Sequence, residues 1–426
     1  MFRFYSTRRR AFAWPLVVGF CVSGLPLLTS SAATLAEQAP PALRDALQGA
    51  WQDHPLHDVT EAQLAAASAR RDAAGQPLYN PELEFQINDE GEDRSATAGF
   101  SLTLDLGGKR RARRDAAGAR LDEAIAEARQ RRRVFIHDWL VAWTDLHTAA
   151  QRIALGERRL ALVARFAGLA ERQFLADDIS SLERDLATLA HDEALVEQSK
   201  LESDLSNAKA ALVALGGAGD HFPTNELATG SLPETVGMPG DLQAQPDWQV
   251  AQARAQASTR EVVVARRNRI ADPTLGISGG RIDYGSFRDN VIAISLSVPL
   301  FVRNTHASEV VAAQADADAA DAEIAHVRLK IDAERQRATT NYASSRRAWS
   351  RWQSSRGTDI EHRAQLLERL WREGELSTAD TLLQLRQTLD TALAGIELEA
   401  RVWRDYGDIL AAADQLERWV GWENTP

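Results

Sequence analysis

The sequence predicts a mainly α-helical chain with a small membrane-exposed β part, and three observations support this fold class. One pattern of segments occurs twice along the chain. Each copy contains two short segments in which apolar and polar residues alternate, which is the period of a strand. Each copy then continues into a very long Ala-rich segment with heptad periodicity, which is typical of packed helices.

The stretch Thr97–Arg114 joins a predicted strand to a predicted helix. Alternation up to Leu106 gives it one apolar and one polar face, Gly107–Gly108 ends the alternation, and Lys109–Arg114 is strongly basic. In a membrane barrel the apolar face meets lipid and the polar face lines water, while basic side chains reach the lipid headgroups. For this stretch alone, a strand of a soluble β-sandwich is the alternative.

Residues 1–36 are typical of a secretory signal peptide. Arg8–Arg10 precede an apolar run over residues 11–28 that ends in small residues, and a membrane anchor is the alternative. Cys21 is the only cysteine, so we expect no disulfide and no thiol chemistry after cleavage. The net charge of −11 argues against nucleic acid as a partner. No later apolar run is long enough for a helical span, so a membrane crossing must use strands.

The duplication divides the remaining chain into two repeats, 37–215 and 241–426, with a Gly-, Pro- and Thr-rich linker over 216–240. Asn80–Leu83 recurs as Asp272–Leu275, and Glu171–Phe174 recurs as Glu368–Trp371. Each repeat therefore has the same order of elements.

We expect each repeat to consist of a helix, two strands, a very long helix and a return helix. In the first repeat these are residues 39–76 with a break at His54–Pro55, then 83–88, an acidic loop over 89–93, 97–106, 109–174 and 180–215. In the second they are 247–270, 274–281, a loop over 283–289, 291–300, 304–372 and 377–413. The helix over 109–174 is on the order of 100 Å long.

Four strands are too few to close a membrane barrel, which needs about eight or more, so several chains must share one. Heptad rows, such as Trp139, Leu146, Ile153 and Leu160, indicate closely packed long helices. By themselves such rows indicate only a long helical bundle.

The chain resembles the TolC-like outer membrane efflux proteins, most closely the cobalt–zinc–cadmium type of heavy-metal efflux component. The resemblance rests on the duplicated plan and on four segments: Asn80–Phe85 (NPELEF), Leu104–Arg113 (LDLGGKRRAR), Ser297–Phe301 (SVPLF) and Gly374–Arg386 (GELSTADTLLQLR). It covers nearly the whole chain after the signal.

The resemblance implies a homotrimer in which the strands form one twelve-stranded outer-membrane β-barrel and the helices form a periplasmic α-barrel. It implies a passive exit duct for divalent heavy-metal cations, with outer-membrane lipid around the strands. A periplasmic adaptor protein would connect the duct to an inner-membrane pump of the resistance-nodulation-division kind. Multidrug efflux and type I protein secretion remain alternative functions of such a duct. A soluble coiled-coil adaptor and an envelope enzyme are the alternatives from other classes.

No cofactor, resident metal site or catalytic residue is expected. Gly107–Lys109 lacks the flanking residues of a phosphate-binding loop. His54 and His57 are a weak candidate metal pair without nearby carboxylates. The acidic stretch 316–323 is expected to be a solvated helix face, and a cation-lined duct wall is the alternative.

The strand alternation predicts two sets of site residues. Those expected to face lipid are Phe100, Leu102, Leu104, Ile292, Ile294 and Leu296. Those expected to face the lumen are Ser101, Thr103, Asp105, Ser295 and Ser297.

The turns at 175–179 and 372–376 are expected to form the periplasmic tip and, by the resemblance, to contact the adaptor. Gly374 suits a turn with positive φ, and Ser180 and Ser377 are candidate N-caps of the return helices. The predicted tip residues are Asp177, Asp178, Ile179, Ser180, Glu373, Gly374, Glu375, Leu376, Ser377 and Asp380. In a trimer their carboxylates would meet at one rim and favour cations. Ordinary solvated turns are the alternative.

Overall fold

A computed structural model describes residues 38–91, 93–217, 232–233, 236–237, 241–355 and 360–422. These residues belong to one compact unit. The predicted signal peptide lies outside the described residues, and so does most of the predicted linker.

The first repeat begins with α1 (Pro41–Asp53) and α2 (Pro55–Ala74), which are separated at His54 as predicted. The hairpin of β1 (Glu82–Glu90) and β2 (Asp93–Thr103) follows. Helix α3 (Lys109–Leu175) then runs for 67 residues without interruption, about 100 Å at 1.5 Å per residue. Helix α4 (Ser181–Val213) returns along it.

The second repeat has α5 (Pro246–Asn268), β3 (Thr274–Asp283) and β4 (Arg288–Ser297). Helices α6 (Ala307–Ser355), α7 (Ile360–Arg372) and α8 (Thr378–Ala412) follow. The single helix predicted over 304–372 therefore corresponds to α6 and α7, and the four residues between them lie outside the described part. The short α9 (Leu416–Trp419) was not predicted.

The strand connections are tighter than the sequence predicted. Asp89 and Glu90 extend β1 and Asp93 begins β2, so the acidic loop expected over 89–93 is a turn at Gly91, whose φ is 76°. Asp283 pairs with Arg288 across β3 and β4 in the same way. Two pairs of opposite charge, Asp89 with Arg94 and Asp283 with Arg288, stabilise these lengthened strand ends.

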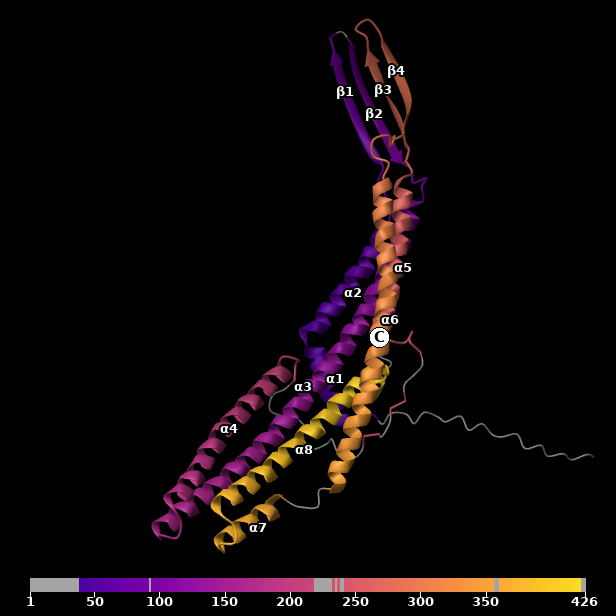
Figure 1. The fold of residues 1–426 in the computed structure, drawn as a ribbon. Coiled ribbons are helices and arrows are strands. Elements are labelled where there is room, and N and C mark those ends of the chain that lie inside the picture. Colours follow the sequence, from indigo (N-terminus) through magenta and orange to yellow (C-terminus); the bar gives the residue numbers. More distant parts are fainter. Residues whose placement is uncertain are drawn as a thin grey trace, which may run out of the picture. The chain divides into compact units, whose positions relative to one another are not determined.

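The described strands form one antiparallel sheet in the order β1-β2-β3-β4 (Figure 1). The central pair, β2 and β3, comes from different repeats, and ten residues of each are in register. The sheet thus unites the two hairpins, and each hairpin continues into its own long helix.

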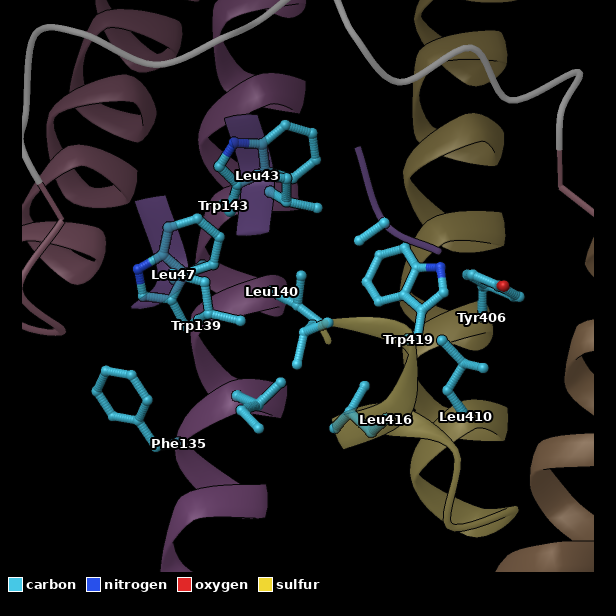
Figure 2. Close-up of a cluster of buried hydrophobic side chains, with 14 of the residues drawn as sticks. Leu43, Leu47, Phe135, Trp139, Leu140, Trp143, Tyr406, Leu410, Leu416 and Trp419 are labelled. Atoms are coloured by element: carbon cyan, nitrogen blue, oxygen red, sulfur yellow. The ribbon is translucent and has the colours of Figure 1, made fainter. Parts of the chain in front are cut away.

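The main core joins α1, α3, α8 and α9 near the middle of α3 (Figure 2). Trp139 on α3 and Leu410 on α8 are fully buried, and Leu47 and Leu416 close the cluster. The predicted close approach of helices also occurs at Gly156, where an added Cβ would collide with Gln198 and Leu201 of α4. The absence of a side chain at Gly156 therefore leaves room for two larger residues of α4, as expected for closely packed long helices.

Candidate functional site

Residues that are directly opposite each other in an antiparallel sheet point to the same face. The register places Leu83, Phe100, Ile277 and Ile294 in one row, and Leu102, Leu275 and Leu296 in the next. The other face contains rows such as Glu82, Ser101, Gly276 and Ser295, and Thr103, Thr274 and Ser297. The sheet consequently has one continuous apolar face and one polar face, and the sequence-predicted strand residues are separated between them.

The apolar face is unusually exposed for large side chains. Ile292 and Ile294 are each 82 % accessible, and Leu83, Phe85 and Ile87 of β1 are also exposed. Such a contiguous apolar surface is rare on a protein surrounded by water and marks an interaction with lipid or with another protein.

Leu104 and Asp105 lie just after β2 and not within it. The N–H of Leu104 donates to the Pro273 carbonyl, so the pairing continues briefly. The Asp105 carboxylate accepts hydrogen bonds of 2.8 Å from the backbone N–H groups of Lys109 and Arg110. Because these N–H groups open α3, the carboxylate stabilises the start of the helix.

A buried ion pair joins the two repeats beside this helix start. Lys109 Nζ lies 2.8 Å from Asp272 Oδ2, and the two side chains are only 11 % and 3 % accessible. The Tyr79 hydroxyl donates to the same oxygen at 2.7 Å, which raises the pKa of Tyr79 to about 12. Sequence reasoning missed this triad, although Asp272 replaces Asn80 in the duplicated pattern and so signals a difference between the repeats.

The turn between α3 and α4, which is the first predicted tip, has the conformation that its residues favour. Asp177 adopts a positive φ of 59°, and Ser180 and Glu183 form a capping box at the start of α4. At the second tip Gly374 has a φ of 76°, and the Ser377 hydroxyl accepts a hydrogen bond from the Asp380 N–H. Both predicted N-caps are confirmed, because each hydroxyl satisfies an otherwise free N–H group.

The two tips are also connected to each other. The buried Trp371 indole N–H donates to Thr378 Oγ1 at 3.1 Å, and that hydroxyl contacts Glu183 Oε1 at 3.4 Å. The Trp371 ring packs on Phe166, with centroids 4.1 Å apart. This contact anchors the turn of the second repeat to helices α3 and α4 of the first.

The predicted tip residues divide by exposure. Ile179 and Leu376 are half-buried and pack against the hydrophobic clusters behind the turns. The side chains that remain exposed are those of Asp177, Asp178, Ser180, Glu373, Glu375, Ser377 and Asp380. The carboxylates are therefore available to solvent or to a partner.

None of the helices in the described ranges combines the length and the apolar character needed to cross a bilayer. Over the same ranges, no group of three or more His, Cys, Asp or Glu side chains is placed to hold a metal ion. His54 instead accepts the Leu56 N–H and caps α2. The carboxylates of the acidic stretch of α6, from Asp316 to Glu323, are exposed.

Comparison with known proteins agrees with this geometry. The family model described as outer membrane efflux protein matches residues 46–218. The nickel and cobalt resistance protein CnrC of Cupriavidus metallidurans is 32 % identical over 345 residues, which cover 78 % of this chain and 79 % of that protein. The nickel-cobalt-cadmium resistance protein NccC of Alcaligenes xylosoxydans xylosoxydans is 27 % identical over 338 residues, which cover 76 % of this chain and 75 % of that protein.

The fold is also that of a solved structure, a membrane protein from Pseudomonas aeruginosa. The two share 19 % sequence identity with a TM-score of 0.75, over 89 % of this chain and 93 % of the other. The long helices, the four described strands and the sequence similarity over three quarters of the chain thus indicate the same family. This chain belongs to the outer membrane efflux protein family, whose members are located in the outer membrane with long helices in the periplasm.

Proposed function

We propose that three copies of this chain form one exit duct, in which the strands make a twelve-stranded barrel and the helices make a periplasmic tube. The support is the described four-stranded sheet, whose apolar face is exposed and which has too few strands to close a barrel alone. In this arrangement the apolar face meets lipid, and Ser101, Thr103, Ser295 and Ser297 line the lumen. Asp105 lies at the barrel–tube junction.

Purification in detergent tests the assembly. We expect a trimer by light scattering coupled to size exclusion, with the helix content retained. A stable helical monomer in detergent would contradict the proposed shared barrel.

The proposed cargo is a divalent heavy-metal cation such as nickel, cobalt, zinc or cadmium. The support is the sequence similarity to CnrC and NccC, which are described as nickel–cobalt and nickel–cobalt–cadmium resistance proteins. The chain acts as a passive duct, so an inner-membrane pump of the resistance-nodulation-division kind supplies the energy. A periplasmic adaptor connects the pump to the exposed tip residues, which include Asp178 and Glu375.

Deletion of the gene tests the cargo. We expect lower tolerance to nickel, cobalt, zinc or cadmium, restored by a plasmid copy. Sensitivity to dyes and detergents with unchanged metal tolerance would indicate multidrug efflux instead. Loss of a secreted protein from the medium would indicate type I secretion.

A further inference from the structure

The two faces of the sheet differ in the charges that they carry. The register places Glu82 and Glu84 of β1 on the polar face, together with Glu90, Asp93 and Asp289. The basic residues of the described strands, Arg94, Arg281 and Arg288, all lie on the opposite face. Every charged residue that the described strands place on the polar face is therefore acidic.

Two of the three basic residues on the apolar face, Arg94 and Arg288, are paired with acidic residues on the same face. Asp89, Arg94, Asp283 and Arg288 form a single row across the four strands, at the hairpin end of the sheet. Arg94 contacts Asp89 at 3.1 Å and Arg288 contacts Asp283 at 2.7 Å. Acids and bases therefore alternate in this row, which leaves no net charge.

The polar face offers its carboxylates no such partners. Glu82 shares its row with Ser101, Gly276 and Ser295, and Glu84 shares its row with Gly99, Ser278 and Ala293. Both glutamates are exposed, and their row neighbours are small and uncharged. Within the described strands, the two carboxylates are therefore the longest side chains of these two rows and have no cation to compensate them.

We infer that Glu82 and Glu84 select for cations in the barrel part of the duct. This inference rests on the proposed shared barrel, in which each carboxylate is repeated three times around the lumen. Unpaired charges of one sign raise the local concentration of counter-ions and repel ions of like charge. The cargo class that fits this lining is a hydrated cation, including a divalent metal ion.

The selectivity has a characteristic salt dependence. The Debye length is about 8 Å at 0.15 M salt and about 30 Å at 0.01 M. Carboxylates on the wall of a wide lumen therefore influence passing ions most strongly in dilute salt. Cation preference should increase as the salt concentration falls.

The test measures the reversal potential of the purified full-length channel in planar bilayers under a potassium chloride gradient. We expect the wild type to prefer potassium and the double variant Glu82→Gln/Glu84→Gln to shift the reversal potential toward zero. Arg281→Gln, on the opposite face, is the matched control and should leave it unchanged. An unchanged reversal potential in the double variant, or anion preference in the wild type, would overturn the inference.

Cysteine substitution gives a second readout, because the only native cysteine, Cys21, lies in the predicted signal peptide. A water-soluble trimethylammonium thiosulfonate should modify Glu84→Cys and reduce its cation preference, but should not modify the neighbouring Phe85→Cys. Modification of Phe85→Cys and not of Glu84→Cys would overturn the inference. A wild type that forms no channels would instead contradict the proposed function, so the two failures are distinguishable.

Discussion

Lys109 Nζ lies 2.8 Å from Asp272 Oδ2, so the first residue of α3 in one repeat is paired with a residue just before β3 in the other. Tyr79, which precedes β1, donates to the same carboxylate. The triad therefore connects three places in the chain: the segment before β1, the segment before β3 and the first residue of α3. It fixes the sheet to the helices at the place where the chain passes from strands to helices.

Removing one partner of this pair should destabilise the protein strongly. Asp272→Asn leaves the Lys109 ammonium buried without a counter-charge, and breaking a buried pair in this way costs about 3–5 kcal/mol. We expect a lower melting temperature and a lower yield of assembled protein. The double variant Lys109→Met/Asp272→Asn, which leaves no buried charge, should recover most of the loss. Equal melting temperatures for the single and double variants would contradict this account.

The two faces of the sheet should differ in their tolerance of charge. Leu102 lies in an apolar row with Leu275 and Leu296, whereas Ser101 lies in the row of Glu82. An Arg on the lipid face of a barrel costs about 2–4 kcal/mol at the bilayer midplane. Leu102→Arg should therefore impair assembly, and Ser101→Arg should be tolerated beside an acidic neighbour. Heat-modifiable migration in SDS gels measures both, and similar yields would refute the assignment of faces.

The strands and long helices were predicted well because their signals lie in residues that are close together in the sequence. The period of two identified the strands, and the heptads identified α3 to within one residue of its end. The sequence did not reveal that β2 pairs with β3, because that pairing joins residues about 180 positions apart. For the same reason the structure was needed to show the Lys109–Asp272 contact and the uncharged neighbours of Glu82 and Glu84. The short α9 was missed because four residues give too little periodicity.

The contact between α3 and α8 should make stability depend on pH. His137 Nε2 lies 2.8 Å from Asp408 Oδ1, Arg337 of α6 lies 3.8 Å from the other oxygen, and Asp138 lies beside the ring. The hydrogen bond to Asp408 raises the pKa of His137 above its ordinary value of 6.5, against the opposing effect of burial. The imidazolium–carboxylate pair is therefore fully formed below pH 6.5 and is lost as the pH rises through the raised pKa.

The expected result is a free energy of unfolding that falls by about 1.5–3 kcal/mol as the pH rises from 6.5 through the raised pKa of His137, the size of a hydrogen bond to a charged group. His137→Gln should remove most of this slope. His191→Gln is the matched control, because the acidic partner of His191 is its exposed neighbour Asp192, at 3.7 Å. Denaturation curves at several pH values measure the effect, and an identical slope in wild type and His137→Gln would rule out this contact as its source.

The exposed carboxylates of the tip allow a test at the other end of α3. Asp177, Asp178, Glu373 and Glu375 lie in the two turns, whose backbones are held by N-caps and by the Trp371–Thr378 contact and do not depend on these carboxylates. Asn at position 177 also tolerates the positive φ found there. Neutral variants should therefore keep the turns intact, which separates the effect of charge from an effect on folding.

The prediction is that the tip carboxylates bind divalent cations that enter from the periplasmic side. In a trimer the three copies of each turn bring their carboxylates to one rim, where like charges repel unless cations screen them. Divalent cations added at the periplasmic side should block the wild-type channel in planar bilayers, and the quadruple variant with Asn at 177 and 178 and Gln at 373 and 375 should lose the block. Glu82→Gln/Glu84→Gln is the control, since it alters the barrel and should retain the periplasmic block. Unchanged block in the quadruple variant would place the constriction elsewhere and leave the tip as a contact for the adaptor alone.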